Sequence, residues 1–581
     1  MRKKLIYLFV AAPLLFLAGC SGSGDDTDTN VEEQSMYGGV FRMPINSYFA
    51  PIRVAEVQKL ETAQVYEQVY EGLVKYNAKT LEVEPSLASE WQVSPDGLTY
   101  TFTLRDEVYF HDNACFEGGK GRKMTAQDVI YSFQTIYTPA PENRAYYTFK
   151  NTIAGGDDFY NGKVTEISGI KADGNKIAFQ LTEPSTIFLK KMAAVFAVIV
   201  PKESVEATEF VPVGTGPFIY DKNNSTAEIV RLFKNPRYHG MDAQGNKLPY
   251  LDSVVFKYYE HSEDPMELFW SGTMSYIPDV PVTRISEVLE ERISDFESKP
   301  PKYILISEPQ LSTTYLEFNM TNKALKNKKV RKAINHAINR QKLVEKIMKN
   351  QAYEIGKFGM TPPLPKVFKD YDFEGIEDVS YQYNPELAKK LMAEAGYPDG
   401  RGFPTLTFQF RLGNDHYLVA SEIQNQLRSV LNINVEIEAI EFNDLIENQG
   451  HGRADIFRTT WFGDYPSPET WLLNAYGKIV PSDRKLPSYV NSARFQNASF
   501  DKFFEEGIHA ATVEDSYKAF AAAEKVLMEE APFIVLWYGE DMMLVQSSVR
   551  DLETNGMRYL DLRNVYFKEP TAEEYTEKKQ Q

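Results

Sequence analysis

The hydrophobic residues of this chain repeat with a period of two in some stretches and near 3.6 in others, and this alternation limits the fold more than any other feature. Residues 99–105 alternate strictly, with Tyr100, Phe102 and Leu104 on one side, and follow the turn-forming Ser94-Pro95-Asp96-Gly97. We therefore predict a strand here. The same alternation predicts strands at 176–181, 405–411 and 432–441.

Helical patterns lie between the predicted strands. Thr125 and Asp128 form a capping-box pattern, and Asn384 can cap a helix that begins at Pro385 and ends before Gly396. Two helix faces carry apolar residues at helical spacing: Val129, Phe133, Ile136 and Tyr137 in one, and Val330, Ile334, Ala337 and Ile338 in the other. Strands and helices alternate over 581 residues without a short repeat, so we predict a mixed α and β (α/β or α+β) protein of several domains.

Composition excludes several classes of protein. The 63 Lys and Arg residues against 81 Asp and Glu residues give a formal net charge of −18, which disfavours binding to nucleic acid. Hydrophobic residues at 43% and charged residues at 25% exclude a disordered or fibrous chain. The two cysteines, Cys20 and Cys115, are too few for a disulfide framework or a four-cysteine zinc site.

The first twenty residues predict export. Three basic residues at positions 2–4 precede an apolar stretch from Leu5 to Gly19, which as a helix would span roughly 22 Å and is too short to cross a membrane. The stretch ends in Leu17-Ala18-Gly19-Cys20, which resembles a bacterial lipoprotein box and implies lipid on Cys20; a plain signal peptide is the alternative. We expect a leader at 1–20, a flexible tether at 21–35, and a protein held in the cell envelope, on the extracytoplasmic face of a bacterial membrane.

No motif of a common enzyme class occurs. The sequence lacks G-x-S-x-G, H-E-x-x-H and G-x-x-x-x-G-K-[ST], and its acidic residues are too numerous for any catalytic pair to stand out. His111, Asp112 and Cys115 are close enough in sequence to suggest metal ligands. Three residues in one loop are weak evidence, and a partly buried histidine beside a free thiol is favoured. We expect no enzyme activity, no cofactor and no bound metal.

Short motifs follow one another along the chain in a characteristic order. Those of the first half are Tyr70-Glu71-Gly72-Leu73-Val74, Glu84-Pro85-Ser86-Leu87-Ala88, Glu90-Trp91, Ser94-Pro95-Asp96-Gly97, Phe110-His111-Asp112, Thr125-Ala126-Gln127-Asp128-Val129 and Gly214-Thr215-Gly216-Pro217-Phe218. Those of the second half are Val330-Arg331-Lys332-Ala333-Ile334, Asn384-Pro385-Glu386-Leu387-Ala388, Ala395-Gly396-Tyr397 and Asp464-Tyr465-Pro466-Ser467-Pro468-Glu469. Together they resemble the extracytoplasmic solute-binding proteins that serve ABC importers of oligopeptides, dipeptides and nickel. One departure is a longer stretch at 113–123, which we expect to decorate the surface.

The resemblance implies a two-lobed periplasmic-binding-protein fold with an additional domain and a ligand cleft between the lobes. It places a discontinuous first domain at 36–58, 201–300 and 536–581, a second at 59–200 and a third at 301–535. The implied function is a monomeric receptor that closes on peptides and delivers them to ABC permease subunits. A nickel chelate, an opine or an oligosaccharide is the alternative ligand, and an exported hydrolase is the alternative of another class.

The resemblance also implies where the ligand ammonium binds. In peptide-binding members of the family, the aspartate of the motif Trp461-Phe462-Gly463-Asp464-Tyr465 grips the ligand α-amino group, which assigns that role to Asp464 here. Trp461 and Tyr465 supply large rings that exclude water around it. A simple turn residue before Tyr465-Pro466 is the alternative for Asp464.

Further contacts to the ligand are expected elsewhere. Arg458 matches a basic family position that can neutralise the ligand carboxylate, but an ideal strand would point Arg458 and Trp461 to opposite faces, and a surface or ion-paired arginine is equally compatible. The segment from Gln58 to Leu60 would pair with the ligand main chain as in β-augmentation. The motif Gly214-Thr215-Gly216-Pro217 is expected to form a strand-initiating turn or a hinge, because glycine gives the backbone freedom.

Overall fold

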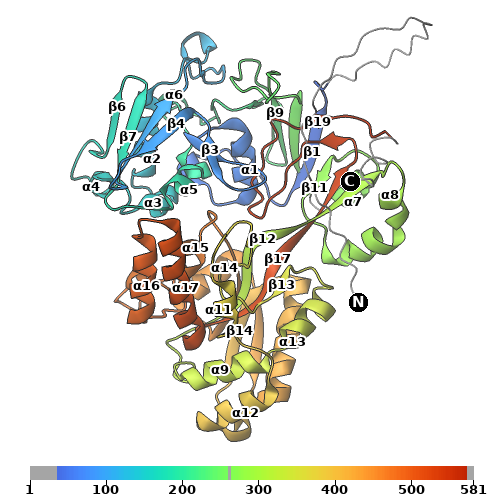
Figure 1. Cartoon of the computed structure of the whole chain (residues 1–581). Coiled ribbons are helices and arrows are strands. Elements are labelled where there is room, and N and C mark those ends of the chain that lie inside the picture. The colour runs from blue at the N-terminus through green and yellow to red at the C-terminus, as the bar shows by residue number, and fades with distance from the viewer. Residues whose placement is uncertain (1–35, 260–263, 572–581) are drawn as a thin grey trace, which may run out of the picture. The chain divides into compact units, whose positions relative to one another are not determined.

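The computed structural model describes residues 36–259 and 264–571. The predicted leader (1–20), the predicted tether (21–35) and the predicted lipidation site Cys20 lie outside the described residues. Within those two ranges no helix is long and apolar enough to cross a membrane. Helices and strands alternate along this part of the chain (Figure 1), so the predicted mixed α and β fold is confirmed.

One four-stranded sheet joins strands that are far apart in sequence. β1 (Val40–Ile45) runs parallel to β10 (Ser253–Tyr258), and β9 (Ile229–Lys234) and β8 (Phe218–Tyr220) extend the sheet in antiparallel register. Its apolar side chains share a core with α1 (Leu60–Val69) and with the C-terminal part of the chain. Members of this core are Phe41, Val65, Tyr66, Val230, Phe256, Leu560 and Leu562.

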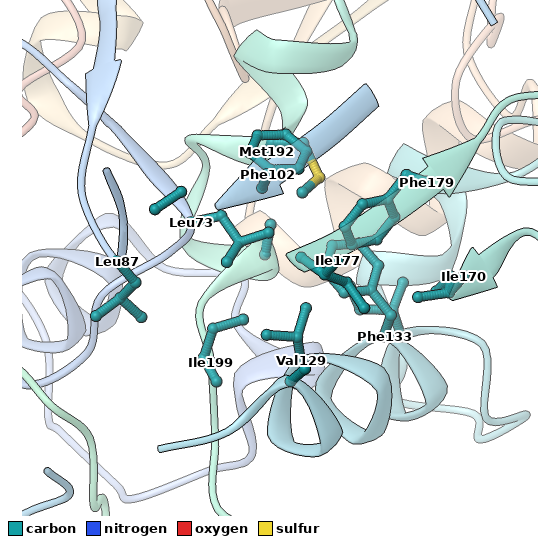
Figure 2. Close-up of a cluster of buried hydrophobic side chains, with 14 of the residues drawn as sticks. Leu73, Leu87, Phe102, Val129, Phe133, Ile170, Ile177, Phe179, Met192 and Ile199 are labelled. Atoms are coloured by element: carbon teal, nitrogen blue, oxygen red, sulfur yellow. The ribbon is translucent and has the colours of Figure 1, made fainter. Parts of the chain in front are cut away.

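A second sheet has the order β4-β5-β7-β6 and is antiparallel throughout. Its strands are β4 (Ala88–Val93), β5 (Thr99–Leu104), β6 (Ile170–Asp173) and β7 (Lys176–Gln180), and α2 (Ala126–Ile136) packs on it. Figure 2 shows the apolar core that results, with Phe102 and Phe179 from the sheet beside Val129 and Phe133 from α2. The alternation predicted for residues 99–105 is confirmed, since Tyr100, Phe102 and Leu104 are buried.

Two long strands run side by side through the middle of the chain's largest sheet (Figure 1). β12 (Tyr303–Phe318) pairs antiparallel with β17 (Phe533–Gln546), with an irregularity in the pairing between Pro309 and Thr313. One end of the pair packs in the core of the first sheet, and the other end packs in the core of the region that lies between the two strands in sequence.

The rest of this sheet extends from β12 through parallel strands. β16 (Ile456–Phe462) is antiparallel to β12, and β14 (Leu406–Arg411) is parallel to both β16 and β15 (Val435–Ile440). One core of this region joins β14 and β16 to α9 (Lys328–Ala337), α12 (Pro385–Glu394) and α13 (Asn414–Leu431). Another joins Tyr315 of β12 to α16 (Ala498–Ile508) and α17 (Val513–Glu530).

The local signals of the sequence hold with two corrections. The Thr125 amide donates to the Asp128 carboxylate over 2.8 Å, and the Asn384 side chain accepts from the Leu387 amide over 3.0 Å, so both predicted helix starts are confirmed. The strand predicted from residue 432 begins only at Val435, because Asn432 is the left-handed residue that ends α13. The predicted faces ending at Tyr137 and Ile338 each extend one residue beyond their helix.

The remaining elements are short. The helices are α3 (Ala145–Phe149), α4 (Gly156–Tyr160), α5 (Phe188–Met192), α6 (Lys202–Val205), α7 (Pro265–Trp270), α8 (Ile293–Glu297), α10 (Arg340–Lys342), α11 (Phe373–Glu377), α14 (Phe442–His451) and α15 (Glu469–Leu472). The strands are β2 (Val74–Tyr76), β3 (Val83–Pro85), β11 (Tyr276–Ile277), β13 (Glu354–Ile355), β18 (Val549–Arg550) and β19 (Tyr566–Phe567).

Candidate ligand-binding site

The motif at 461–465 lies where β16 ends. The Gly463 amide donates to the Leu311 carbonyl over 2.9 Å, which ties the end of β16 to β12. A Cβ atom at Gly463 would lie 2.5 Å from the ring of Trp471, so the chain can turn here only with glycine. Asp464 is therefore held at a fixed point beyond the end of the strand.

Asp464 combines exposure with an environment that disfavours its charge. Its side chain is exposed, yet the surrounding protein raises the pKa of its carboxyl to about 6, and the neighbouring Glu469 adds to this rise. The Thr470 hydroxyl, 3.5 Å from the carboxylate, and the Lys191 ammonium oppose it. Water can reach this carboxyl although protein atoms surround it, and a cation can bind strongly to such a group. We call the surroundings of Asp464 the recess.

The other side of this recess comes from a distant part of the chain. Tyr76, at the end of β2, is buried and its hydroxyl donates to the Lys190 carbonyl over 2.5 Å. The Lys190 ammonium in turn donates to the Pro466 carbonyl over 2.6 Å. The Lys191 ammonium lies 5.7 Å from the centre of the Tyr465 ring. α5 and β2 thus meet the motif that carries Asp464.

The two predicted aromatic neighbours of Asp464 have different environments. Trp461 is half-buried, and its indole N–H donates to the Thr470 hydroxyl over 3.3 Å. Tyr465 is buried, and its hydroxyl donates to the Glu469 carboxylate. Thr470 contacts both Trp461 and Asp464, although no sequence signal distinguished it. Trp461 borders the recess, whereas Tyr465 supports it from inside the core.

Arg458 lies on the other face of β16. Its guanidinium is 5.2 Å from the centre of the Trp537 ring and hydrogen-bonds to Nδ1 of His416 at the start of α13. Trp461 instead packs in the core around α16 and α17, so the prediction of opposite faces is confirmed. Among the described residues no ion pair includes Arg458, and its buried Nε has no hydrogen-bond partner. Burial lowers the pKa of Arg458 to about 10.

His416 was not singled out in the sequence. Burial lowers the pKa of its imidazole to about 4, and the positive charges of Arg458 and Arg411 add to the effect. A neutral imidazole can accept a hydrogen bond from Arg458 but cannot neutralise it. The pair therefore presents a positive charge beside the aromatic ring of Trp537, and the carboxylate of Asp415 acts on it from outside ion-pair distance.

Leu60 begins α1 rather than extending a strand. Lys59 before it is extended, with φ −105° and ψ 137°, and the Ala63 amide donates to the Lys59 carbonyl over 3.1 Å. Gln58, Lys59 and Leu60 are all exposed, Leu60 at 38%. Pairing with a ligand main chain stays a prediction here, and only the residues before Leu60 have the extended backbone that it requires.

The residues suspected as metal ligands are used in other ways. His111 is buried, with Nε2 2.9 Å from the Gly216 carbonyl, and burial lowers its pKa to about 4. Asp112 pairs with Arg237 at 2.7 Å, and Cys115 is a free thiol whose pKa burial raises to about 11. Across residues 36–259 and 264–571 no three such side chains are grouped to hold a metal ion.

His111 contacts the motif Gly214-Thr215-Gly216-Pro217 through the Gly216 carbonyl. The motif leads directly into β8, as expected of a strand-initiating turn. Its glycines are required by close approach rather than by backbone freedom, because a Cβ at Gly214 would lie 2.1 Å from the Val69 carbonyl oxygen and one at Gly216 2.6 Å from it. A hinge role is untested.

Comparisons with known proteins agree with this fold. The family model described as "Bacterial extracellular solute-binding proteins, family 5 Middle" matches residues 82–480. Heme-binding protein A of Haemophilus influenzae is 27% identical over 91% of this chain and 92% of its own, and the dipeptide-binding protein of Escherichia coli is 24% identical over 83% and 86%. The structure of the periplasmic binding protein DppA of Helicobacter pylori with the peptide STSA is 25% identical, with a TM-score of 0.73 over 93% of this chain and 100% of that one.

These matches bear out the resemblance drawn from the motifs and the fold predicted from it. The family match covers well over half of the chain and includes most of the motifs in the order in which they occur. The solved structures that match are periplasmic binding proteins of mixed α and β fold. This chain belongs to the bacterial extracellular solute-binding proteins of family 5.

Proposed function

We propose that this protein is a non-enzymatic receptor that binds peptides outside the cytoplasm and delivers them to the membrane subunits of an ABC importer. The observation that carries the proposal is the Asp464 carboxylate, which is accessible but surrounded by protein and lacks an ionic partner at hydrogen-bond distance among the described residues. A peptide ammonium would supply the missing positive charge. The peptide in the Helicobacter pylori structure and the name of the Escherichia coli relative support this choice of ligand.

Arg458 supports a second contact, to the ligand carboxylate. A buried guanidinium with a free Nε and no ionic partner in the described part of the chain is costly unless an anion joins it. Because Nε is buried on the face of β16 opposite Trp461, a ligand carboxylate could accept from it only after the Arg458 side chain rearranges. Trp461 would contact ligand side chains, Tyr465 would hold the motif in place, and the segment ending at Leu60 would meet the ligand main chain.

Hinge closure is the proposed mode of capture. The contacts between α5 and the motif at 461–465 join residues of the expected second domain (59–200) and third domain (301–535). The first domain is proposed at 36–58, 201–300 and 536–581, and β12 and β17 would be the strands that connect it to the third. The apolar cores support this division only in part. Val65 and Tyr66 of α1 pack with the first sheet. Tyr76 and Ile187 of the proposed second domain, and Leu536 and Trp537 of the proposed first domain, pack with residues of the third. Ligand bound between domains would favour the closed state by its differential affinity.

The leader and Cys20 complete the proposal. Lipid on Cys20 and the tether at 21–35 would keep the receptor at the outer face of a bacterial membrane, within reach of the permease. The proposed receptor is a monomer. Mass spectrometry of the lipoprotein purified from membranes tests the lipid, since the expected N-terminus is acylated Cys20 and an unmodified N-terminus would contradict it.

Identification of the ligand is the decisive experiment. Native mass spectrometry of the exported protein should reveal copurified peptides, and a heme, nickel chelate, opine or oligosaccharide in their place would contradict the peptide assignment. The recovered peptide should return unchanged after incubation, whereas steady turnover would indicate a hydrolase.

A variant tests the site itself. Asp464→Asn keeps the shape of the side chain but removes its charge, and calorimetry should show peptide affinity weakened by at least about 2 kcal/mol. Asp173→Asn, in the exposed part of β6, is the matched control and should bind as the wild type does. Unchanged affinity in Asp464→Asn would remove Asp464 from the site.

A further inference from the structure

Residues 552–560, which we name the strap, connect β18 to the C-terminal part of the chain without forming a helix or strand. The strap covers a cavity of about 20 Å³, room for about one water molecule, whose other walls include Gln64, Tyr276 and Met543. The strap is held by apolar packing of Met557, Tyr559 and Leu560 and, around the cavity, by polar contacts.

The strongest of these contacts is an ion pair with β17. The Arg558 guanidinium donates through Nε to the Asp541 carboxylate over 2.7 Å and makes a second hydrogen bond to it through Nη2. Asp541 is fully buried, and the Gln310 side chain of β12 also donates to it. Arg558 further pairs with Asp279 at 3.4 Å. The strap is thus fastened to both long strands at one point.

That point is where the two long strands lose their regular pairing. Between Pro309 and Thr313 the register of β12 against β17 shifts, so Leu311 has no ladder partner on β17. The Leu311 amide donates instead to the Gly556 carbonyl of the strap over 2.7 Å. A Cβ at Gly556 would lie 2.6 Å from the Pro309 carbonyl oxygen, which shows how closely the strap approaches β12.

Leu311 also contacts the ligand-binding motif. Its carbonyl accepts from the Gly463 amide over 2.9 Å, and Gly463 directly precedes Asp464. The two backbone groups of one residue therefore connect the strap on one side to the ligand-binding motif on the other. Next to Gly556, the Asn555 side chain of the strap donates to the Ala78 carbonyl over 2.7 Å, beside β2.

We propose that the strap sets the position of Asp464 through Leu311 and Gly463, which makes Arg558 a positioning residue for ligand capture. The inference rests on the proposed role of Asp464 in binding a ligand ammonium. In this role Arg558 would act without contacting the ligand. The ion pair of Arg558 with Asp541 fixes the strap. The strap in turn binds Leu311, which has no ladder partner on β17, and Leu311 binds the turn at Gly463. Loss of the ion pair between Arg558 and Asp541 should therefore let Asp464 leave the geometry that binds the ammonium.

The test compares variants of Arg558 in the full chain. Arg558→Gln should weaken binding of the peptide Ser-Thr-Ser-Ala or of tri-alanine about tenfold, mainly through faster dissociation, and Arg558→Lys should recover part of the loss. Arg401→Gln is the control, because Arg401 pairs with Asp399 on the exposed surface. Since Arg558→Gln leaves Asp541 buried and unpaired, the double variant Asp541→Asn/Arg558→Gln, which removes both charges, guards against loss of folding.

A second readout separates positioning from stability. Peptide affinity of the wild type should fall below a midpoint near pH 6, where Asp464 gains a proton. In the double variant the melting temperature should approach that of the wild type, while affinity stays about tenfold weaker and the midpoint moves toward the ordinary range for aspartate. A double variant that binds as tightly as the wild type, with the same midpoint, would overturn the role of the strap. Failure of the wild type to bind either peptide would instead count against the proposed function.

Discussion

Glu71 and Asp464 are two carboxylates in protein-dense surroundings, and the protein treats them in opposite ways. Glu71 is buried and accepts hydrogen bonds from the Thr215 and Tyr238 hydroxyls, each over 2.9 Å, with His239 Nε2 at 2.9 Å and the Arg563 guanidinium at 3.7 Å. Burial alone would raise the pKa of Glu71, but His239, Arg563 and Tyr238 outweigh it and lower that pKa to about 2. Glu71 is fully satisfied by the protein itself.

Asp464 has no such set of partners. Within the described part of the chain, its one side-chain hydrogen bond is the 3.5 Å contact to Thr470, and its pKa is raised to about 6 instead of lowered. Protein-dense surroundings near other charged groups therefore do not identify a ligand site by themselves. Glu71 and Asp464 differ in whether the protein supplies partners for the carboxylate charge. Glu71 holds the fold together, while Asp464 is left for a partner from outside.

The largest expected effect is on the free energy of unfolding and comes from replacing Glu71. Glu71→Ala removes the acceptor for two hydroxyls and leaves Arg563 buried with less compensation, so the free energy of unfolding should fall by about 3–5 kcal/mol. Urea denaturation measures it, with exposed Glu117→Ala as the control. Peptide affinity of the folded fraction should not change. A Glu71→Ala protein that is as stable as the wild type but binds peptide more weakly would mean that Glu71 has a role in binding and not in stability.

The second expected effect is on binding and on its dependence on pH. A ligand ammonium needs the ionised form of Asp464, whose pKa is raised to about 6. Peptide affinity should therefore be greatest near pH 7, where the ligand amine is still mostly protonated, and fall about tenfold for each pH unit well below 6. Calorimetry between pH 4.5 and pH 8 measures the midpoint, and Asp464→Asn should abolish this dependence. A midpoint near the ordinary aspartate value would mean that Asp464 is not the group that titrates.

The sequence predicted the local secondary structure better than it predicted the properties of the candidate site. The strand at 99–105 and the helix capped by Asn384 were predictable because their signals are local: strict alternation in one, a cap followed by proline in the other. Asp464 could be assigned a role only through its resemblance to a family motif. Nothing in the residues around it indicated that its pKa would be raised, because that depends on contacts made by the folded chain.

Long-range partners account for what the sequence could not predict. Thr470, His416 and Lys190 contribute to the candidate site through contacts with residues between six and 276 positions away. Leu60 shows the same limit in another form, since it was expected to pair with ligand as an extended residue and is instead the first residue of α1. Periodicity predicts which face of an element is buried, but not which distant element covers it.

The third expected effect concerns a buried carboxyl that resembles Asp464 but is not exposed. Burial raises the pKa of Glu317 to about 7, and one of its carboxylate oxygens has no hydrogen-bond partner among the described residues. A raised pKa in the folded state means that the stability it contributes is present below about pH 4.5 and is lost as pH rises through about 7. Glu317→Gln should thus gain about 1–3 kcal/mol relative to the wild type at pH 8 and little at pH 4.5. Equal effects at both values would show that Glu317 is already paired.

The smallest expected effect separates two contacts between the same parts of the chain. Glu183 and His509 form an ion pair near α5, but their side chains are 58% and 48% exposed, and exposed pairs contribute roughly 0–1 kcal/mol. Lys190 donates to the Pro466 carbonyl from a more enclosed position, where burial lowers its pKa to about 8. Glu183→Gln should change the peptide dissociation constant by less than about twofold and the change should vanish in high salt. Lys190→Met should weaken affinity several-fold at any salt, since it leaves the Pro466 carbonyl beside Asp464 without its donor. Measuring both variants at low and high salt shows whether the enclosed hydrogen bond or the exposed ion pair holds α5 against the ligand motif. A larger loss of affinity in Glu183→Gln than in Lys190→Met would mean that the exposed ion pair does.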